Sequence, residues 1–383
     1  MEPMIPPEGE KLLEDLAFDL STKAHGLAGS VPPLIIKSMA PLVKSMNCYY
    51  SNLIEGHYTH PRDIDRALRE DYETQPQKRN LQLEARAHIE VQDLIESLPN
   101  DTSYLSTHFI LWLHKEFCSR LPEALLKVEN PVTGEVVQVI PGEFRKSDVQ
   151  IGRHIPPPAS DLVTYMKYFE EAYASSRLSK LRQVIAVAAS HHRFLWIHPF
   201  YDGNGRVARL FSDALLKSVG IRNDLWSISR GLARTVQDYK LHLARADSQR
   251  HSHLDGRGNL SQKELIAFCE YFLATCIDQV KFMEQLLDWK NFLPRLNALC
   301  DTYVQQKKLL SGSFALLREV VFEGEIERGK AALITGYKER QARSILSQLI
   351  KEEFLISDTP KGNVRMNFPL KIVGDLFPNL YPS

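Results

Sequence analysis

Apolar positions recur at helical spacing through most of the chain. The clearest case is 262–289, where apolar residues mostly three or four positions apart would share one face of a helix. These residues are Leu265, Phe268, Phe272, Leu273, Ile277, Val280, Met283 and Leu286. Similar patterns predict helices over 11–20, 34–54, 57–71, 80–98, 107–120, 181–194, 206–216, 235–247, 293–309, 314–322 and 339–353. The chain is therefore predicted to be mainly α-helical.

Two stretches indicate β-structure instead. Turn residues and alternating β-branched residues over 132–140 predict a hairpin, and the run 142–155 continues from it. Near the C-terminus, 354–357 and 364–368 are separated by turn residues and predict a second, two-stranded hairpin. Strands are thus expected only as minor additions to the helices.

The helical pattern breaks at 198–209, whose sequence is His-Pro-Phe-Tyr-Asp-Gly-Asn-Gly-Arg-Val-Ala-Arg. Gly203 and Gly205 place a loop before a helix that resumes at Arg206, and Asn204 between them can donate a further hydrogen bond. Backbone N–H groups at a helix N-terminus have no intrahelical acceptor and favour anions. Glycines let such a loop close around a phosphate, because no Cβ blocks the approach. This stretch therefore predicts a phosphate-binding turn.

The side chains of the same stretch suit reactions of a nucleoside triphosphate. Arg206 and Arg209 lie on one helix face, and guanidinium groups match phosphate oxygens bidentately. Asp202 offers an oxygen ligand of the kind that Mg²⁺ takes together with substrate phosphates. His198 is the nearby side chain whose unperturbed pKa suits a base near neutral pH. Each residue alone has an ordinary structural interpretation, but together they predict a base, a metal ligand and a phosphate site.

Residues 198–209 resemble, without a mismatch, the core motif of Fic proteins. The resemblance implies a mainly α-helical Fic fold, a helical bundle with a β-hairpin flap. It also implies that AMP moves from ATP to a Ser, Thr or Tyr hydroxyl of a target protein. In that scheme His198 deprotonates the hydroxyl, Asp202 holds Mg²⁺ and Arg209 meets the γ-phosphate. The acidic residue at 202 separates the chain from Doc-like relatives, which transfer phosphate instead.

The resemblance also implies a set of nucleotide-binding residues. They are Ile151, Gly152, Arg153, His154, Asp202, Gly203, Asn204, Gly205, Arg206, Val207, Ala208, Arg209, Tyr239 and Asp247. Tyr239 and Asp247 fall where relatives contact the adenosine. Many relatives have asparagine at the position of Asp247, and the chain departs from them there.

The run 143–155 resembles the Fic flap, a hairpin over the active site. The resemblance implies that an edge strand of this flap pairs with an extended segment of the target protein and brings its hydroxyl to the base. Pairing of this kind tolerates sequence variation because it uses main-chain hydrogen bonds. An ordinary hairpin is the alternative interpretation.

Residues 51–56, Ser-Asn-Leu-Ile-Glu-Gly, resemble the inhibitory motif of Fic proteins. The resemblance implies that Glu55, with Ser51, enters the nucleotide pocket. A carboxylate there can pair bidentately with Arg209 and take the place of the γ-phosphate. Alternatively, Glu-Gly is a common helix ending, because glycine adopts the left-handed conformation. Glu55 could also orient a water molecule for the reverse reaction, hydrolysis of the AMP–protein bond.

Residues 291–383 resemble a winged helix, a module often found after Fic cores. Its basic residues suit DNA phosphates and are Lys338, Arg340, Arg343, Lys361 and Arg365. The region carries 13 Lys and Arg against 10 Asp and Glu, only +3, whereas DNA-binding domains have a strong basic excess. A protein partner, or packing within a dimer, is an equal alternative. The rival function is a DNA-binding regulator that only senses nucleotide, and the intact His198 argues against it.

Composition narrows these hypotheses slightly. With 47 Lys and Arg and 47 Asp and Glu, the formal net charge is zero and favours neither nucleic acid nor a membrane. The five cysteines are scattered, no signal-peptide pattern is visible, and no run of about 18 apolar residues occurs, so a cytoplasmic protein is expected. We expect a helical region carrying the inhibitory helix at 1–104, a Fic core at 105–290 and the winged helix at 291–383. The long helix over 262–289 could carry a homodimer contact.

Overall fold

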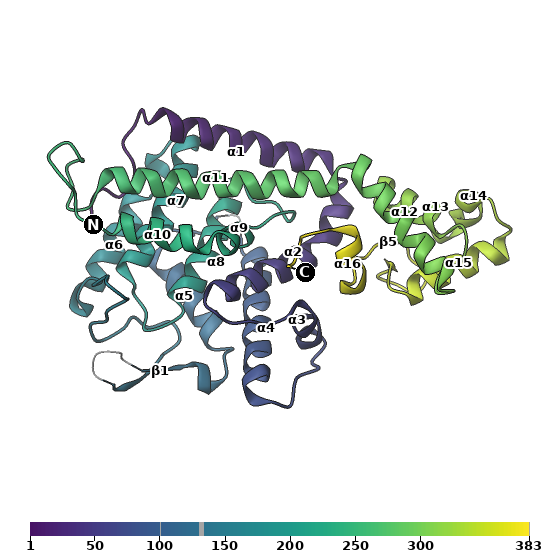
Figure 1. Ribbon diagram of the computed structural model, residues 1–383, viewed down its shortest axis with the longest axis horizontal. Helices are drawn as coiled ribbons and strands as arrows, with labels where there is room; N and C mark the ends of the chain where they lie inside the picture. Colours follow the sequence, from purple (N-terminus) through teal and green to yellow (C-terminus); the bar gives the residue numbers. More distant parts are fainter. Residues whose placement is uncertain (100, 130–133, 383) are drawn as a thin grey trace. The chain divides into compact units, whose positions relative to one another are not determined.

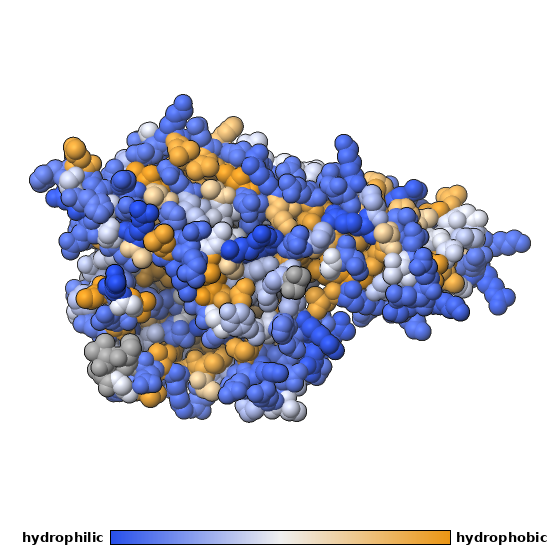
Figure 2. Space-filling model, viewed as in Figure 1, coloured by the Kyte–Doolittle hydropathy of each residue, from blue (hydrophilic) through white to orange (hydrophobic). Residues whose placement is uncertain are grey.

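The computed structural model describes residues 1–99, 101–129 and 134–382 (Figure 1). Helices make up most of these residues and the strands are few and short, which confirms the predicted mainly helical fold. On the face shown in Figure 2, hydrophilic residues dominate and hydrophobic residues gather in smaller patches. This distribution is expected when the apolar faces of the helices are buried.

The elements follow in chain order. The α-helices are α1 Lys11–Ser30, α2 Pro33–Ile54, α3 Pro61–Leu68, α4 Pro76–Ser97, α5 Thr107–Cys118, α6 Leu162–Ala172, α7 Lys180–Ile197, α8 Asn204–Ser218, α9 Ile228–Arg234, α10 Val236–Ala246, α11 Gln262–Leu287, α12 Trp289–Gln305, α13 Ser313–Glu323, α14 Ala331–Thr335, α15 Glu339–Lys351 and α16 Leu370–Leu376. Short 3₁₀ helices are η1 Glu123–Leu125, η2 Ala159–Asp161, η3 Ser175–Arg177 and η4 Arg328–Lys330. The strands are β1 Lys127–Glu129, β2 Val136–Gln138, β3 Glu325–Ile326, β4 Leu355–Ile356 and β5 Val364–Met366.

The chain forms two compact units that interleave along the sequence. The first comprises Met1–Ala24, Asn47–Asn223 and Ser227–Gln279, and the second comprises His25–Met46, Asp224–Trp226 and Val280–Ser383. The first unit contains both the 198–209 motif and residues 51–56. The predicted division into domains at residues 104 and 290 stays a prediction.

Helices α7 and α8 support the motif loop within the first unit. They pack against each other, α5 packs on α8, and α6 packs on α7 (Figure 1). Every residue from Val184 to Phe194 in α7 and from Arg206 to Leu216 in α8 is buried. Because these helices are enclosed on all sides, the loop between them has rigid ends.

Local sequence explains where these two helices begin and end. Ser179 caps α7 by accepting a hydrogen bond from Arg182 N at 3.3 Å. The helix ends at Ile197, and the next residue, His198, has a left-handed φ of 48°. Gly203 precedes α8 with a φ of 82°, a conformation that glycine adopts without the steric penalty of a Cβ. The helix–loop–helix predicted from the glycines is therefore confirmed.

The predicted β-structure before the motif is present but displaced. β1 and β2 form an antiparallel pair. Residues 132–133 of the hairpin predicted over 132–140 lie outside the described residues. In the run 143–155, the described backbone has one isolated antiparallel bridge, between Ile151 and His154. This run is thus a loop with one tight turn, and the regular hairpin lies earlier in the chain.

The second unit contains a small sheet among its C-terminal helices. Along the chain α13, β3, α14, α15, β4 and β5 follow one another, and the strands form an antiparallel sheet of order β3-β5-β4. The hairpin predicted over 354–357 and 364–368 is confirmed, with Leu355 opposite Met366. The sequence does not predict β3, because two residues are too few to show an alternating pattern. The winged helix itself stays a prediction that this element order favours.

Two of the five basic residues predicted to meet DNA are held in ion pairs. Arg365 binds both oxygens of Asp358 at 2.7 Å and is largely buried, while Arg343 Nη2 lies 2.9 Å from Glu339 Oε2 on an exposed face. The exposed pair is weak, but the bidentate pair of Arg365 neutralises a cation that a DNA phosphate would need. These contacts weaken the DNA interpretation relative to a protein partner.

None of the described helices is by itself long and apolar enough to cross a membrane, although α1 and α2 taken as a bent pair meet the same criteria of length and composition. All five cysteines are buried with free thiols. Burial raises the pKa of the Cys118 thiol to about 12. The thiol therefore stays protonated, and Cys118 is a core residue rather than a nucleophile.

Candidate active site

The loop between α7 and α8 is closed by Asn204. Its side-chain oxygen accepts a hydrogen bond from Phe200 N at 3.1 Å, and its amide nitrogen donates to Phe200 O at 2.8 Å. The side chain is buried and both of its polar ends are used within the loop. The amide nitrogen has a second N–H, so a further hydrogen bond to a ligand stays a prediction for a side chain that is almost fully buried. The backbone N–H of Asn204 is the group suited to an anion.

His114 supports the loop from α5. Its ring stacks on Phe200, with 3.8 Å between the ring centroids and 6° between the ring planes. Gly142 N donates to His114 Nδ1 at 2.9 Å, so the proton lies on Nε2, which donates to the Asp202 carbonyl oxygen at 3.3 Å. Burial lowers the pKa of His114 to about 4 and keeps the ring neutral. The sequence does not reveal this role, because a helical histidine is more often a packing residue.

Arg145 holds the run 143–155 against the loop. The side chain is 2% exposed, and it donates from Nε to His198 O at 2.9 Å and from Nη2 to Pro157 O. Its backbone N donates to Pro199 O at 2.9 Å. These contacts explain why the run is a loop, because its backbone is secured by a buried guanidinium rather than by a partner strand. The sequence does not reveal Arg145 as a support.

His198 begins the loop and is the predicted base. Its backbone N–H donates to Phe194 O at 3.1 Å. Burial, with the neighbouring charges of His154 and Arg145, lowers the pKa of His198 to about 4. The imidazole is therefore neutral at pH 7 and able to accept a proton.

The N-terminus of α8 is the anion-binding part of the loop. Val207 N makes the first bond of the helical ladder, to Gly203 O at 2.9 Å, so the N–H groups of residues 204–206 precede that ladder. Helix ends of this kind bind phosphates and carboxylates. The Glu55 carboxylate lies here, since a Cβ built on Gly205 would overlap it. Glycine at 205 is thus required for the close approach of an anion.

The predicted contact between Glu55 and Arg209 is present with a different geometry. Arg209 Nη2 donates to Glu55 Oε1 at 2.5 Å and to Ser51 O at 3.0 Å, while Nε donates to Ser51 Oγ at 2.9 Å. Glu55 therefore shares one hydrogen bond with Arg209 rather than the predicted bidentate pair, because Ser51 occupies the Nε side of the guanidinium. Burial raises the pKa of Glu55, but Arg209 and Arg206 outweigh that effect, and the net pKa is lowered.

Arg206 lies between two carboxylates. Its Nη1 donates to Glu84 Oε1, and its Nη2 donates to both Asp202 oxygens at 3.0 and 3.2 Å. The Glu84 side chain, on α4, is fully buried, whereas that of Asp202 is 44% exposed. Glu84 is a site residue that the sequence does not reveal, since a lone helical glutamate is almost always exposed.

Asp202 suits the predicted metal site as one ligand among several. The described part of the chain contains no group of three or more His, Cys, Asp or Glu side chains that could hold a metal ion. Mg²⁺ commonly takes one or two carboxylates and completes its shell with substrate phosphates and water. The exposed carboxylate of Asp202 is therefore suited to supply one ligand to Mg²⁺ that is bound together with a nucleotide.

The residues predicted to contact adenosine face protein groups. Tyr239 is 2% exposed, and its hydroxyl lies 2.7 Å from His191 Nε2. Asp247 lies 3.1 Å from His192 Nε2 and 3.8 Å from His154 Nδ1. A buried Tyr239 cannot present its ring to a nucleotide in this arrangement, so the structure gives that contact no support. The partly exposed Asp247 connects α10 to the turn at His154.

The remaining predicted nucleotide contacts divide by burial. Residues 151–153 are exposed at their turn, and His154 Nε2 lies 2.7 Å from Trp196 O. The exposed turn is open to a ligand, and a contact there stays a prediction. Val207 and Ala208 are fully buried in α8, so their side chains support the helix rather than touch a nucleotide.

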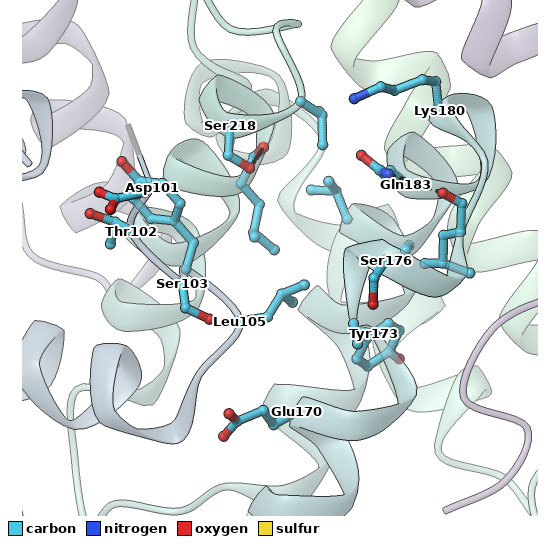
Figure 3. Close-up of a pocket in the computed structure, with 17 residues that line it drawn as sticks. Asp101, Thr102, Ser103, Leu105, Glu170, Tyr173, Ser176, Lys180, Gln183 and Ser218 are labelled. Atoms are coloured by element: carbon cyan, nitrogen blue, oxygen red, sulfur yellow. Dashed lines mark hydrogen bonds between the residues drawn. The ribbon is translucent and has the colours of Figure 1, made fainter. Parts of the chain in front are cut away.

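A separate cavity of about 520 Å³ lies elsewhere in the first unit (Figure 3). Lys180 and Gln183 stand on one side of it, with Asp101 on the other and Glu170 below in this view. Among the described residues that line it, none belongs to 198–209. The cavity is therefore distinct from the candidate active site.

Residues 104–216 match the model of the Fic/DOC family. The chain contains a Fic domain. The matched range includes the loop together with its supports His114 and Arg145. It leaves out Glu55 and Glu84, which approach the loop of the Fic domain from the preceding part of the chain.

Curated relatives match part of the chain. Proteins named protein adenylyltransferase Fic from Drosophila erecta and Drosophila melanogaster are each 41% identical over 96 residues. Those residues are 25% of this chain and 19% and 20% of the two relatives, so the match spans about a fifth of their length.

Solved structures extend the likeness beyond the Fic domain. A Fic family protein from Desulfovibrio desulfuricans G20 is similar with a TM-score of 0.51 at 16% identity, over 92% of this chain and 96% of that one. Fic-1 from C. elegans is similar with a TM-score of 0.53 at 16% identity, over 72% of this chain and 74% of that one. At these identities the likeness concerns the fold alone.

Proposed function

We propose that the chain is a protein adenylyltransferase, which moves AMP from ATP to a Ser, Thr or Tyr hydroxyl of a target protein. The Fic domain and the name of the Drosophila relatives support this function. The observation that carries it is one closed loop that joins a neutral His198, the Asp202 carboxylate and the N-terminus of α8. Nucleotidyl transfer needs these three parts: a base, a metal ligand and a phosphate cradle.

Each group has a place in the reaction. The target hydroxyl passes its proton to His198 while its oxygen forms a bond to the α-phosphorus of ATP. The bond from that phosphorus to the oxygen bridging to the β-phosphate breaks, and pyrophosphate leaves. The N–H groups of residues 204–206, with Arg206 and Arg209, bind and orient the phosphates. Mg²⁺ held by Asp202 and the phosphates would offset the charge that develops on the leaving group.

The same geometry supports autoinhibition by Glu55. Its carboxylate lies against Gly205 and Arg209, the groups proposed to hold the terminal phosphates. Two anions cannot use these donors at once, so a docked Glu55 excludes the productive position of ATP. Gly56 has a left-handed φ of 84°, as expected of a glycine at a helix end. The proposed inhibitory contact of Glu55 does not conflict with that helix ending.

The position of a radioactive label tests the proposed function. In the Glu55→Gly chain with Mg²⁺, ATP labelled at the α-phosphate should label protein, and ATP labelled at the γ-phosphate should not, because pyrophosphate carries the γ-phosphate away. Intact-protein mass spectrometry should show the whole AMP group. Transfer of the γ-label alone would indicate a kinase, and transfer of neither label to the chain itself or to proteins of a cell extract would refute the proposal.

The pH dependence of transfer should reflect a neutral base. A group that must be deprotonated is lost as pH falls through its pKa, so kcat/KM in the Glu55→Gly chain should hold from about pH 8 to about 5 and fall below about 4. The reason is the lowered pKa of His198, about 4. Circular dichroism at each pH checks that the chain stays folded. A decline centred near about 6.5, the ordinary histidine value, would contradict the prediction.

The target segment is proposed to lie along the run 143–155. Ile151 and Ile155 are 43% and 74% exposed there, and Arg145 secures the run beside His198. Exposed apolar side chains in a segment secured beside the base suit contact with an extended polypeptide. We also propose a cytoplasmic location, a DNA or protein partner for the C-terminal region, and a homodimer through α11. The proposed reaction does not depend on any of these.

A further inference from the structure

Glu84 is a buried carboxylate that precedes the residues matched by the family model. None of its side chain is exposed. Its Oε1 accepts from Arg206 Nη1, and its Oε2 lies 2.6 Å from Nδ1 of His57. A carboxylate removed from water destabilises a fold unless it is paired and hydrogen-bonded. Its two partners therefore account for its position, and neither contact is incidental.

The Arg206 guanidinium has several partners, but one of its hydrogen-bond donors is unpaired among the described residues. Its Cζ lies 5.4 Å from the ring centroid of Phe117, and its Nη2 binds Asp202. The buried Nε has no hydrogen-bond partner among the described residues. A buried donor without an acceptor costs free energy, so the pairing of the two terminal nitrogens with Glu84 and Asp202 is needed to keep this guanidinium inside the protein.

The two carboxylates compete for this one cation. Arg206 partly neutralises Asp202, the carboxylate proposed to receive Mg²⁺ with the nucleotide. A guanidinium resting wholly on Asp202 would repel the metal and turn its donors away from the phosphates. Glu84 binds Nη1, the other terminal nitrogen, so Asp202 shares the guanidinium instead of having it alone.

We propose that Glu84 is a positioning residue for the Mg²⁺ complex of a nucleoside triphosphate, an inference that rests on the proposed function. It holds Arg206 so that Asp202 can take the metal while the guanidinium meets a phosphate. Its second oxygen secures His57, two positions after Glu55, to the same anchor. One carboxylate on α4 therefore fixes both the phosphate-binding arginine and the end of the inhibitory segment.

Calorimetric titration with ATP and Mg²⁺ tests this role without turnover. The reference chain carries Glu55→Gly, which removes the competing carboxylate, and His198→Asn, which removes the base while tolerating the left-handed backbone. Adding Glu84→Gln should weaken ATP binding by about 10- to 100-fold, the effect of losing one charge-assisted hydrogen bond, and should raise the Mg²⁺ concentration needed for half-maximal binding. Glu90→Gln is the matched control, because Glu90 lies on the same helix and pairs with Arg86 and Arg120 instead.

A double-mutant cycle separates positioning from general stability. In a reference chain that also carries Arg206→Ala, Glu84→Gln should cause no further loss of ATP affinity, because the side chain through which it acts is gone. Glu84→Asp keeps the charge and should recover part of the affinity, and thermal unfolding shows whether each variant is folded at the temperature of titration.

The possible outcomes are distinct. If the reference chain binds ATP and Glu84→Gln binds it as tightly as Glu90→Gln does, the role of Glu84 is refuted and the proposed function stands. An equal loss with and without Arg206 would show a structural effect and overturn the proposal. Absence of ATP binding by the reference chain would overturn the proposed function and this inference together.

Discussion

Replacing His198 by alanine in the Glu55→Gly chain is expected to lower AMP transfer by about 100- to 10,000-fold, the usual effect of losing a general base. The imidazole is neutral because burial and nearby charges lower its pKa to about 4. The backbone that carries it is also fixed, since Arg145 Nε donates to the carbonyl oxygen of His198. The measurement is the initial rate of transfer of the α-phosphate label to protein.

A second substitution distinguishes lost chemistry from a damaged loop. The φ of 48° at His198 lies in a region that asparagine adopts more readily than alanine. His198→Asn should therefore lose transfer as His198→Ala does, while binding ATP as tightly as the parent chain. If both variants kept transfer within about tenfold of the parent, His198 would not be the base. If ATP binding fell as far as the rate, the loop rather than the chemistry would explain the loss.

Replacing Glu55 by glycine is expected to raise AMP transfer by roughly 10- to 100-fold. The docked carboxylate is held by a charge-assisted hydrogen bond to Arg209 at 2.5 Å and lies against Gly205. Interactions of that kind contribute about 1.5–3 kcal/mol, and ATP must displace them before its phosphates can bind. Removing the carboxylate should increase ATP affinity as well as the rate, and both can be measured on the same preparation.

A matched control is available just after the end of α3. Glu70 also follows a helix end and pairs with an arginine, Arg86, at 3.1 Å, but its side chain is 71% exposed. Glu70→Gly should leave the rate of transfer unchanged. A rise in both variants would indicate a general loosening of the N-terminal region. If the rate of AMP transfer did not rise in the Glu55→Gly chain, Glu55 would not be inhibitory. Its alternative role, orienting a water molecule for removal of AMP, would then be favoured.

The features that could be predicted from the sequence are local ones. The glycines at 203 and 205, between two apolar helical patterns, predicted a helix–loop–helix, because a φ of 82° and a close anion contact both exclude a Cβ. Helix α11 at Gln262–Leu287 also matches its prediction closely, since 26 residues are enough for an apolar face to show its period. The short strands were less predictable, because two or three residues show no period.

The supports of the site could not be predicted, because they come from distant segments with ordinary sequence signals. Glu84 looks like a solvent-exposed helical glutamate, yet it is buried against Arg206. His114 looks like a packing residue, yet it donates a hydrogen bond to the carbonyl oxygen of Asp202. In each case the deciding quantity is burial, which depends on neighbours far away in the chain.

The sequence alone determined the chemical groups of this protein: a histidine, an aspartate, two arginines and two glycines within twelve consecutive residues, and a glutamate that precedes them. Spacing along one loop and one helix is enough to bring those twelve residues together. Only the tertiary structure decided how these groups are charged and oriented. Burial lowers the pKa of His198 to about 4, Arg209 makes one hydrogen bond to Glu55, and Arg206 is shared by two carboxylates. All three depend on packing that excludes water.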